Sequence, residues 1–284
     1  MKYAIAVDSS SDLTCASQLG LAESGDIGFG VASLKIQAGD RHWVDDADLD
    51  VAEMATFLST YKGRSGTACP SVGVWLESFG DAEYVFTVAI TSNLSGCHNA
   101  ALQAKEIYEE QHPDRRVCCL DSLSTGPEMV LIAEKLRELI DAGLDFDTVE
   151  KEVREYMKKT HLLFSLESLD NLAKNGRVSK VVAKAAGILG IRVVGKASDV
   201  GTLQQMHKCR GEKKALATIL EEMEKHGFTG GKVRIAHGLN EAGAKAMLDV
   251  ILAKYPDIEA TIVPFTGLCC FYAERGGIMV GFEG

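Results

Sequence analysis

The feature of this sequence that most constrains its fold is an alternation, across the first half, of short apolar runs with longer amphipathic segments. The longer segments have apolar residues at helical spacing, and the short runs are apolar throughout, as expected of strands buried on both faces. This order predicts a parallel sheet covered by helices on both faces. The predicted strands are residues 3–8, 27–36, 84–90 and 116–122, and the predicted helices are residues 49–61, 97–110 and 128–143.

The second half begins near His161 and has a different pattern. We predict strands at residues 161–168, 232–238, 260–265 and 276–282, and helices at 208–227 and 240–255. A chain of 284 residues is long for a single core. We therefore expect two α/β domains, an N-terminal three-layer domain around a parallel sheet (residues 1–160) and a C-terminal mixed α/β domain (residues 161–284).

Composition excludes several classes of protein. The net charge of -10 argues against general nucleic-acid binding, which needs clustered Lys and Arg. None of the eight cysteines forms a C-x-x-C pair, so no zinc site is expected. No segment resembles the ~20 apolar residues that cross a bilayer, which argues against membrane insertion. The N-terminus turns polar after Val7, too early for a secretion signal, so we expect a cytoplasmic protein.

Loops rich in Ser and Thr lie directly before or after several of the predicted strands and helices of the first half. In an open parallel sheet, ligands bind beyond the carboxyl ends of the strands. Ser, Thr and Asp also cap helices, and for any one loop that role is sufficient. Four such loops at one edge of a sheet favour a polar binding cleft. They are residues 8–14, 65–71, 91–96 and 121–126.

The residue types that are absent from these loops narrow the class of ligand that the loops could bind. Neither Lys nor Arg occurs in residues 8–14, 67–74, 91–104 or 121–134. A G-x-x-x-x-G-K-[ST] motif is absent, and no G-x-G-x-x-G follows the first strand. A nucleotide cofactor is therefore not expected. A carboxylate could be held by hydroxyls and by free N–H groups at a helix start, where Ser95 and Gly96 lie.

A competing interpretation is an enzyme. The sequence DSSSD, which begins at Asp8, resembles phosphatase loops with an aspartyl nucleophile, although those loops carry a second Asp where this chain has Ser10. Ser95 lacks the G-x-S-x-G elbow of α/β-hydrolases. A phosphohydrolase or phosphotransferase that uses Asp8 thus remains the alternative class.

Taken in order, the loops resemble the DegV family. The motifs that carry the resemblance extend over nearly the whole chain, and their ordered set is more specific than any one of them. They are VDSSSDLT, TACPS, ITSNLSG, DSLSTGPEM, ESLDNLAKNGRVSK and KCRGEKKAL.

The resemblance implies two α/β domains with a long-chain fatty acid held in the cleft between them. Members of this family are similar to the binding subunit of bacterial fatty acid kinase, which presents the acyl carboxylate to a separate ATP-dependent kinase. Such a subunit has no catalytic centre and no cofactor of its own. A carrier that binds fatty acid without a kinase is a further alternative.

The same resemblance implies site residues. Thr67 and Ser95 would contact the carboxylate, and Ser92 and Gly96 lie in the same loop as Ser95. The family usually has a His near the C-terminus that supports the carboxylate, but no His follows His237 here. Tyr272 could donate a hydrogen bond in its place.

Two other residues near that position, Glu274 and Arg275, would repel and neutralise a carboxylate, respectively. Arg177 and Arg210 match basic family positions near the face that docks the kinase, although they could equally be solvated surface charges. The small residues within positions 181–195 could line an acyl channel or form ordinary core.

Overall fold

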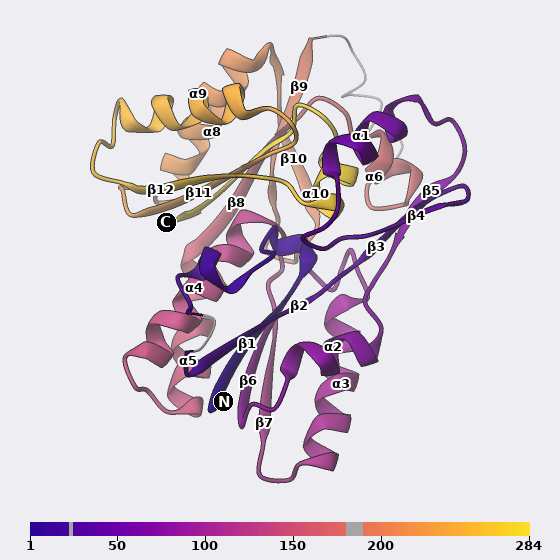
Figure 1. Cartoon of the computed structure of the whole chain (residues 1–284). Coiled ribbons are helices and arrows are strands. Elements are labelled where there is room, and N and C mark those ends of the chain that lie inside the picture. Colours follow the sequence, from indigo (N-terminus) through magenta and orange to yellow (C-terminus); the bar gives the residue numbers. More distant parts are fainter. Residues whose placement is uncertain (23–24, 180–189) are drawn as a thin grey trace.

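The computed structural model describes residues 1–22, 25–179 and 190–284, which form an α/β molecule with two large sheets (Figure 1). The first sheet has four strands in the order β2-β1-β6-β7, and all neighbours in it are parallel. Helices α2 and α3 cover one of its faces and α4 and α5 the other, which gives the predicted three layers. The strands are β1 (Tyr3–Asp8), β2 (Ile27–Ala32), β6 (Tyr84–Ala89) and β7 (Arg116–Asp121), and the helices are α2 (Val72–Phe79), α3 (Cys97–Gln111), α4 (Pro127–Asp141) and α5 (Phe146–Tyr156).

The second sheet is mixed and has six strands in the order β10-β9-β8-β13-β11-β12. Only β11 and β12 are parallel, and the other neighbours are antiparallel. Helices α8 and α9 cover the face away from the first sheet. The strands are β8 (Thr160–Leu166), β9 (Ile191–Ala197), β10 (Leu203–Arg210), β11 (Lys232–His237), β12 (Glu259–Pro264) and β13 (Ile278–Glu283), and the helices are α6 (Asp170–Lys174), α8 (Glu212–Lys225), α9 (Glu241–Leu252) and α10 (Gly267–Ala273).

A small third sheet, β4-β3-β5, projects from the first half and carries one of the predicted site residues, Thr67. It is antiparallel and consists of β3 (Lys35–Ala38), β4 (Arg41–Val44) and β5 (Ser65–Ala68), with α1 (Val51–Thr60) between β4 and β5. Three short 3-10 turns complete the described elements: η1 (Ser9–Ser11), η2 (Ala16–Leu19) and η3 (Met157–Lys159).

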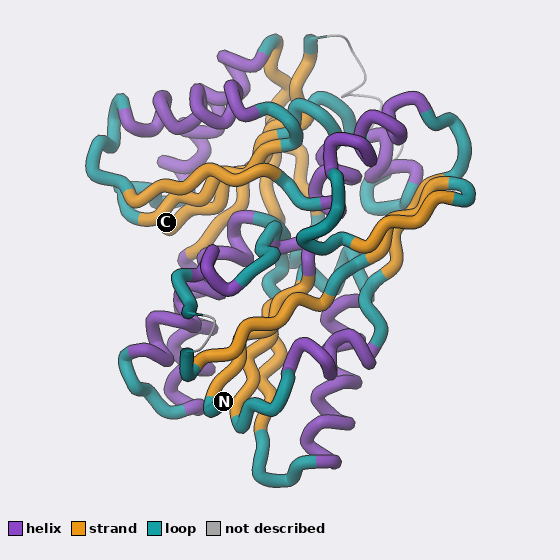
Figure 2. The backbone as a smooth tube through the Cα atoms, viewed as in Figure 1, coloured by secondary structure: helices purple, strands orange, loops and turns teal. Residues whose placement is uncertain are grey.

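Helix α4 lies between the two large sheets, as the trace in Figure 2 shows. It contacts β1 and β6 on one side and β8, β11 and β13 on the other. Side chains around most of its circumference are buried, because both of its sides face a sheet. Gly281 on β13 allows the close approach, since a Cβ there would lie 2.6 Å from the backbone carbonyl carbon of Pro127.

The structure confirms the predicted fold class of an α/β protein with a parallel sheet and a separate mixed sheet. Every strand of the six-stranded sheet lies at or beyond Thr160. The division into domains at residues 160 and 161 stays a prediction, because α4 is shared by both sheets.

Some predicted elements are wrong in detail. Residues 27–36 are not one strand: the chain leaves the first sheet after Ala32, and Leu34 donates its N–H to Ser9 Oγ (3.0 Å) before β3 enters the third sheet. The helix predicted at 208–227 begins only at Glu212, because residues 208–210 pair with β9. The loop at 65–71 contains strand β5.

Within the described residues, no helix is long and apolar enough to span a bilayer. Most of the segment at 181–195 that could wall an acyl channel lies outside the described residues, and its remainder enters β9.

Candidate functional site

A deep cavity opens where the first sheet, the third sheet and the six-stranded sheet meet. The empty space within it, including its open mouth, is ≈ 810 Å³. Its wall is mainly aliphatic and aromatic and comes from both halves of the chain. Apolar residues in the wall include Ile90, Leu162, Phe164, Leu203, Leu268 and Met279.

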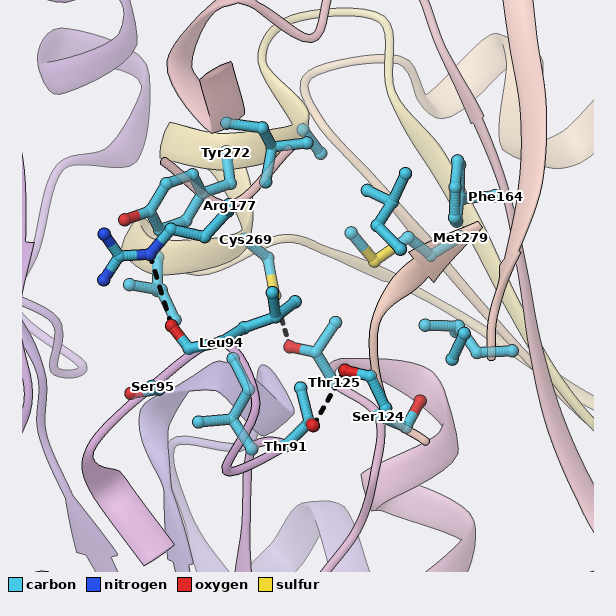
Figure 3. Close-up of a pocket in the computed structure, with 18 of the residues that line it drawn as sticks. Thr91, Leu94, Ser95, Ser124, Thr125, Phe164, Arg177, Cys269, Tyr272 and Met279 are labelled. Carbon is cyan, nitrogen blue, oxygen red and sulfur yellow. Dashed lines mark hydrogen bonds between the residues drawn. The ribbon is translucent and has the colours of Figure 1, made fainter. Parts of the chain in front are cut away.

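Polar groups gather at one end of the cavity. Thr67 Oγ1 on β5 and the Tyr272 hydroxyl on α10 lie 2.9 Å apart and share a hydrogen bond. Ser95, just before α3, lines the same cavity. Figure 3 shows Tyr272, Arg177 and Ser95 on one side of the pocket, with Phe164 and Met279 on the opposite side. The cavity thus has a group of hydroxyls at one end, and apolar side chains make up most of its remaining wall.

Arg177, which the resemblance places near the face that docks the kinase, lines the cavity, and its docking role stays a prediction. It follows α6 and lines the cavity, where its Nε donates to Leu94 O (3.2 Å) and its guanidinium lies 6.0 Å from the centroid of the Tyr272 ring. The four hydroxyl-rich loops contain no lysine, but the wall of the cavity does carry a positive charge, that of Arg177. Arg210 is exposed at the end of β10 and does not line the cavity.

Two predicted residues of the Ser95 loop do not reach the cavity wall. Ser92 is exposed, and its N–H donates to Asp121 Oδ1 (3.1 Å). Gly96 is the exposed N-cap residue of α3, and it faces Cys69 rather than the cavity. This placement does not support a direct contact of either residue with a ligand, whereas Leu94 and Ser95, which lie between them, both line the cavity.

Ser95 itself is held by Cys97, whose Sγ lies 3.1 Å from the serine Oγ. Burial and the nearby Asp8 carboxyl raise the pKa of the Cys97 thiol, so the thiol stays protonated and serves as a hydrogen-bond partner. Of the three residues weighed at the C-terminal position, only Tyr272 lines the cavity. Glu274 accepts from Ser168 Oγ and Asn171 N instead, and Arg275 is exposed.

The Thr91–Ser95 loop has a second task that the sequence did not reveal. Thr91 Oγ1 donates to Gly201 O (2.8 Å), and Asn93 Nδ2 donates to Val200 O (2.5 Å). Both acceptors lie in the turn between β9 and β10, which lines the other part of the cavity. Gly201 has φ +73, and a Cβ there would lie 2.1 Å from Thr91 Oγ1, so the close contact needs glycine.

Lys196, at the end of β9, also lines the cavity and was not singled out from the sequence. Its Nζ lies 3.3 Å from His226 Nε2 and 3.7 Å from Asp199 Oδ1. Its position in an apolar strand gave no local signal that it would reach a cavity.

Asp8, the residue on which the enzyme interpretation depends, is buried and does not line the cavity. Its Oδ1 accepts from the N–H and hydroxyl of Ser10, and its Oδ2 accepts from Ile90 N (2.7 Å). Burial raises the pKa of Asp8 to about 6. Within the described part of the chain, no group of three or more His, Cys, Asp or Glu residues is arranged to hold a metal ion. In this structure Asp8 joins the ends of β1 and β6.

The fold and the site define a class of protein in which an apolar cavity between two sheets ends in a cluster of hydroxyl groups. Such a cavity suits a ligand with one polar end and a long apolar body. The chain belongs to the DegV family: the family model described as "Uncharacterised protein, DegV family" matches residues 2–283.

Similar proteins agree with this membership. A DegV domain-containing protein of Streptococcus pneumoniae is 44% identical over 250 residues, which cover 88% of this chain and 89% of that protein. Among solved structures, a DegV family protein from Eubacterium eligens loaded with heptadecanoic acid has a TM-score of 0.93 and 42% identity, with 99% of each chain covered. The Fatty Acid Kinase (Fak) B3 protein of Streptococcus pneumoniae, loaded with linoleic acid, has a TM-score of 0.95 and 41% identity and covers 100% of this chain and 99% of its own.

Proposed function

We propose that this protein binds a long-chain fatty acid in the cavity and presents its carboxylate to a separate fatty acid kinase. The observation that carries the proposal is the pair of hydroxyls of Thr67 and Tyr272 at one end of a cavity whose wall is mainly apolar. The fatty acids bound to similar proteins from Eubacterium eligens and Streptococcus pneumoniae support it.

The carboxylate is expected to accept hydrogen bonds from Thr67, Ser95 and Tyr272. Hydrogen bonds to a charged group are stronger than those between neutral groups, so a few hydroxyls suffice to orient it. Arg177 adds a positive charge beside Tyr272, which would favour the ionised form of the fatty acid. The protein contributes no catalytic residue in this proposal, and the chemistry belongs to the kinase.

Purified protein tests the binding step. Native mass spectrometry before and after organic extraction should show a mass difference equal to that of one fatty acid, and adding the acid back should raise the melting temperature. Protein that carries no lipid and shows no rise with any fatty acid would contradict the proposal.

A cognate kinase tests the second step and separates the kinase subunit from a simple carrier. Charge reversal of Arg210, which is exposed and outside the cavity, should abolish acyl-phosphate formation and leave lipid binding unchanged. Reversal of Arg177 should weaken both, because Arg177 lines the cavity. Normal acyl-phosphate formation by both variants would remove the docking role of these arginines. Absence of acyl phosphate with the unaltered protein would favour the carrier. A cytoplasmic location belongs to the same proposal.

A further inference from the structure

Helix α10 carries Tyr272 into the cavity, but the helix is too short to hold its own position. It spans seven residues, and isolated helices much shorter than about 12 residues are marginal in water. Its N-cap residue, Thr266, does not cap the helix with its own side chain. The first N–H groups of α10 therefore need other acceptors.

Those acceptors are the oxygens of two buried carboxyl groups from the first half of the chain. Asp45 Oδ1 accepts from Gly267 N (2.5 Å), and Asp45 Oδ2 accepts from Leu268 N (2.9 Å). Asp12 Oδ1 accepts from Thr266 N (2.7 Å). Asp45 and Asp12 are 1% and 3% exposed, so water does not replace these bonds. Both oxygens of Asp45 are thus used to seat the start of α10.

Asp45 is also linked, through β3, to the strand that carries the other hydroxyl of the site. It directly follows β4, and its N–H donates to Leu34 O (2.9 Å) just before β3. β3 pairs with β5 in a register that places Ile36 opposite Thr67. Asp45 therefore connects the third sheet, which carries Thr67, to helix α10, which carries Tyr272.

The glycine at position 267 is a second observation that indicates close contact between the start of α10 and Asp45. A Cβ at Gly267 would lie 2.8 Å from Asp45 Oδ1, 2.5 Å from Leu49 Cδ2 and 3.0 Å from Ile36 Cδ1. Glycine at this position lets the helix start press against the carboxylate and against β3.

From this geometry we infer that Asp45 is a positioning residue for the carboxylate site: it fixes α10 against the third sheet and thereby holds the Tyr272 hydroxyl at hydrogen-bond distance from Thr67. Asp45 touches no ligand itself, since it does not line the cavity. The inference rests on the proposed function, because it assigns Thr67 and Tyr272 to the carboxylate of a fatty acid.

The test compares a fatty acid with the primary alcohol of the same chain length, which has the same tail but no carboxylate. Asp45→Asn keeps the shape of the side chain but turns one acceptor into a donor that faces an N–H. The affinity for the acid should fall by about tenfold, while the affinity for the alcohol changes little. The matched control is Asp46→Asn, an exposed neighbour that should change neither affinity.

A double-mutant cycle with Tyr272→Phe then identifies the path of the effect. If Asp45 acts through Tyr272, the loss from Asp45→Asn should nearly disappear in the Tyr272→Phe background. Additive losses, or equal losses for acid and alcohol, would overturn the inference and leave Asp45 as an ordinary structural cap.

Two further results distinguish a failure of the inference from a failure of the variant to fold and from a failure of the proposed function. If Asp45→Asn does not fold, Gly267→Ala displaces the same contact, and a folded Gly267→Ala protein that keeps its full preference for the acid overturns the inference. If the unaltered protein binds the alcohol as tightly as the acid, the proposed carboxylate site itself fails, whatever Asp45 does.

Discussion

Replacing Thr67 with valine tests the proposed carboxylate site with the smallest change in shape. Valine fits a β-strand as well as threonine does, so β5 and its pairing with β3 should persist. The change removes one hydroxyl that bonds Tyr272 and, in the proposal, the ligand. Because Thr67 is only half-buried, the free energy of unfolding of the lipid-free protein should fall by no more than about 1 kcal/mol.

The effect on binding should be larger. A hydrogen bond to a charged group contributes about 1.5–3 kcal/mol, so the affinity for a fatty acid should fall by about 10- to 150-fold. Isothermal titration of delipidated protein below the micelle concentration of the acid measures the loss. Thr261→Val, on an exposed strand position outside the cavity, is the matched control and should bind normally. An unchanged affinity in Thr67→Val would refute the assignment of this hydroxyl pair to the carboxylate.

Three further predictions concern the pH dependence of stability, the length of the ligand and its rate of release. Burial raises the pKa of Asp12 and of Glu128 to about 7, so both carboxyls favour the neutral form in the folded protein. Their contribution to stability is present below their unfolded pKa values near 4 and is lost as pH rises through 7, so urea denaturation should give a lower unfolding free energy at pH 8 than at pH 5, with a smaller difference in Asp12→Asn. Leu203→Trp fills part of the cavity wall and should shift the bound lipid to shorter chains by mass spectrometry, whereas an unchanged lipid profile would place the tail elsewhere. Asn93→Ala removes the hydrogen bond to Val200 O, worth about 0.5–1.5 kcal/mol, and should speed fatty-acid dissociation by about two- to tenfold in a stopped-flow assay; an unchanged rate would mean that this turn does not limit release.

The part of the site that could be predicted from the sequence lies where a strand pattern ends and a helix pattern begins, which marks the edge of a parallel sheet. Ser95 follows a buried apolar run and precedes a helix, so its place at the end of β6 could be inferred from periodicity alone. Thr67 was assigned to a loop, and only the resemblance to the DegV family directed attention to it. The structure shows instead that it lies in a four-residue strand, which is too short to give a periodic signal.

Several residues are brought to the cavity, or next to it, by tertiary contacts that no local pattern predicts. Arg177 comes from the turn after α6, and nothing in its sequence neighbours indicates that it contacts Leu94. Asp45 follows β4, an exposed strand without apolar alternation, yet its side chain is almost fully buried. Helix α10 is buried on nearly all sides, so it lacks the polar face by which a helix is recognised. Such positions are fixed by the packing of distant segments, and a local pattern does not encode them.

The position of α4 between the two large sheets has a consequence for how a bound lipid leaves. Many two-lobed binding proteins release their ligands by a hinge motion in which the lobes swing apart. Here such a motion would tear α4 from β11 and β13 or from β1 and β6, and it would expose side chains such as Met129, Ile132 and Leu136, which are 0% exposed. The less costly route is a local displacement of one part of the wall, such as the β9–β10 turn, which two hydrogen bonds join to the Thr91–Ser95 loop. On that route, the time for which a lipid stays bound would be set by how often this turn opens, and the packing of α4 between the two sheets would not change.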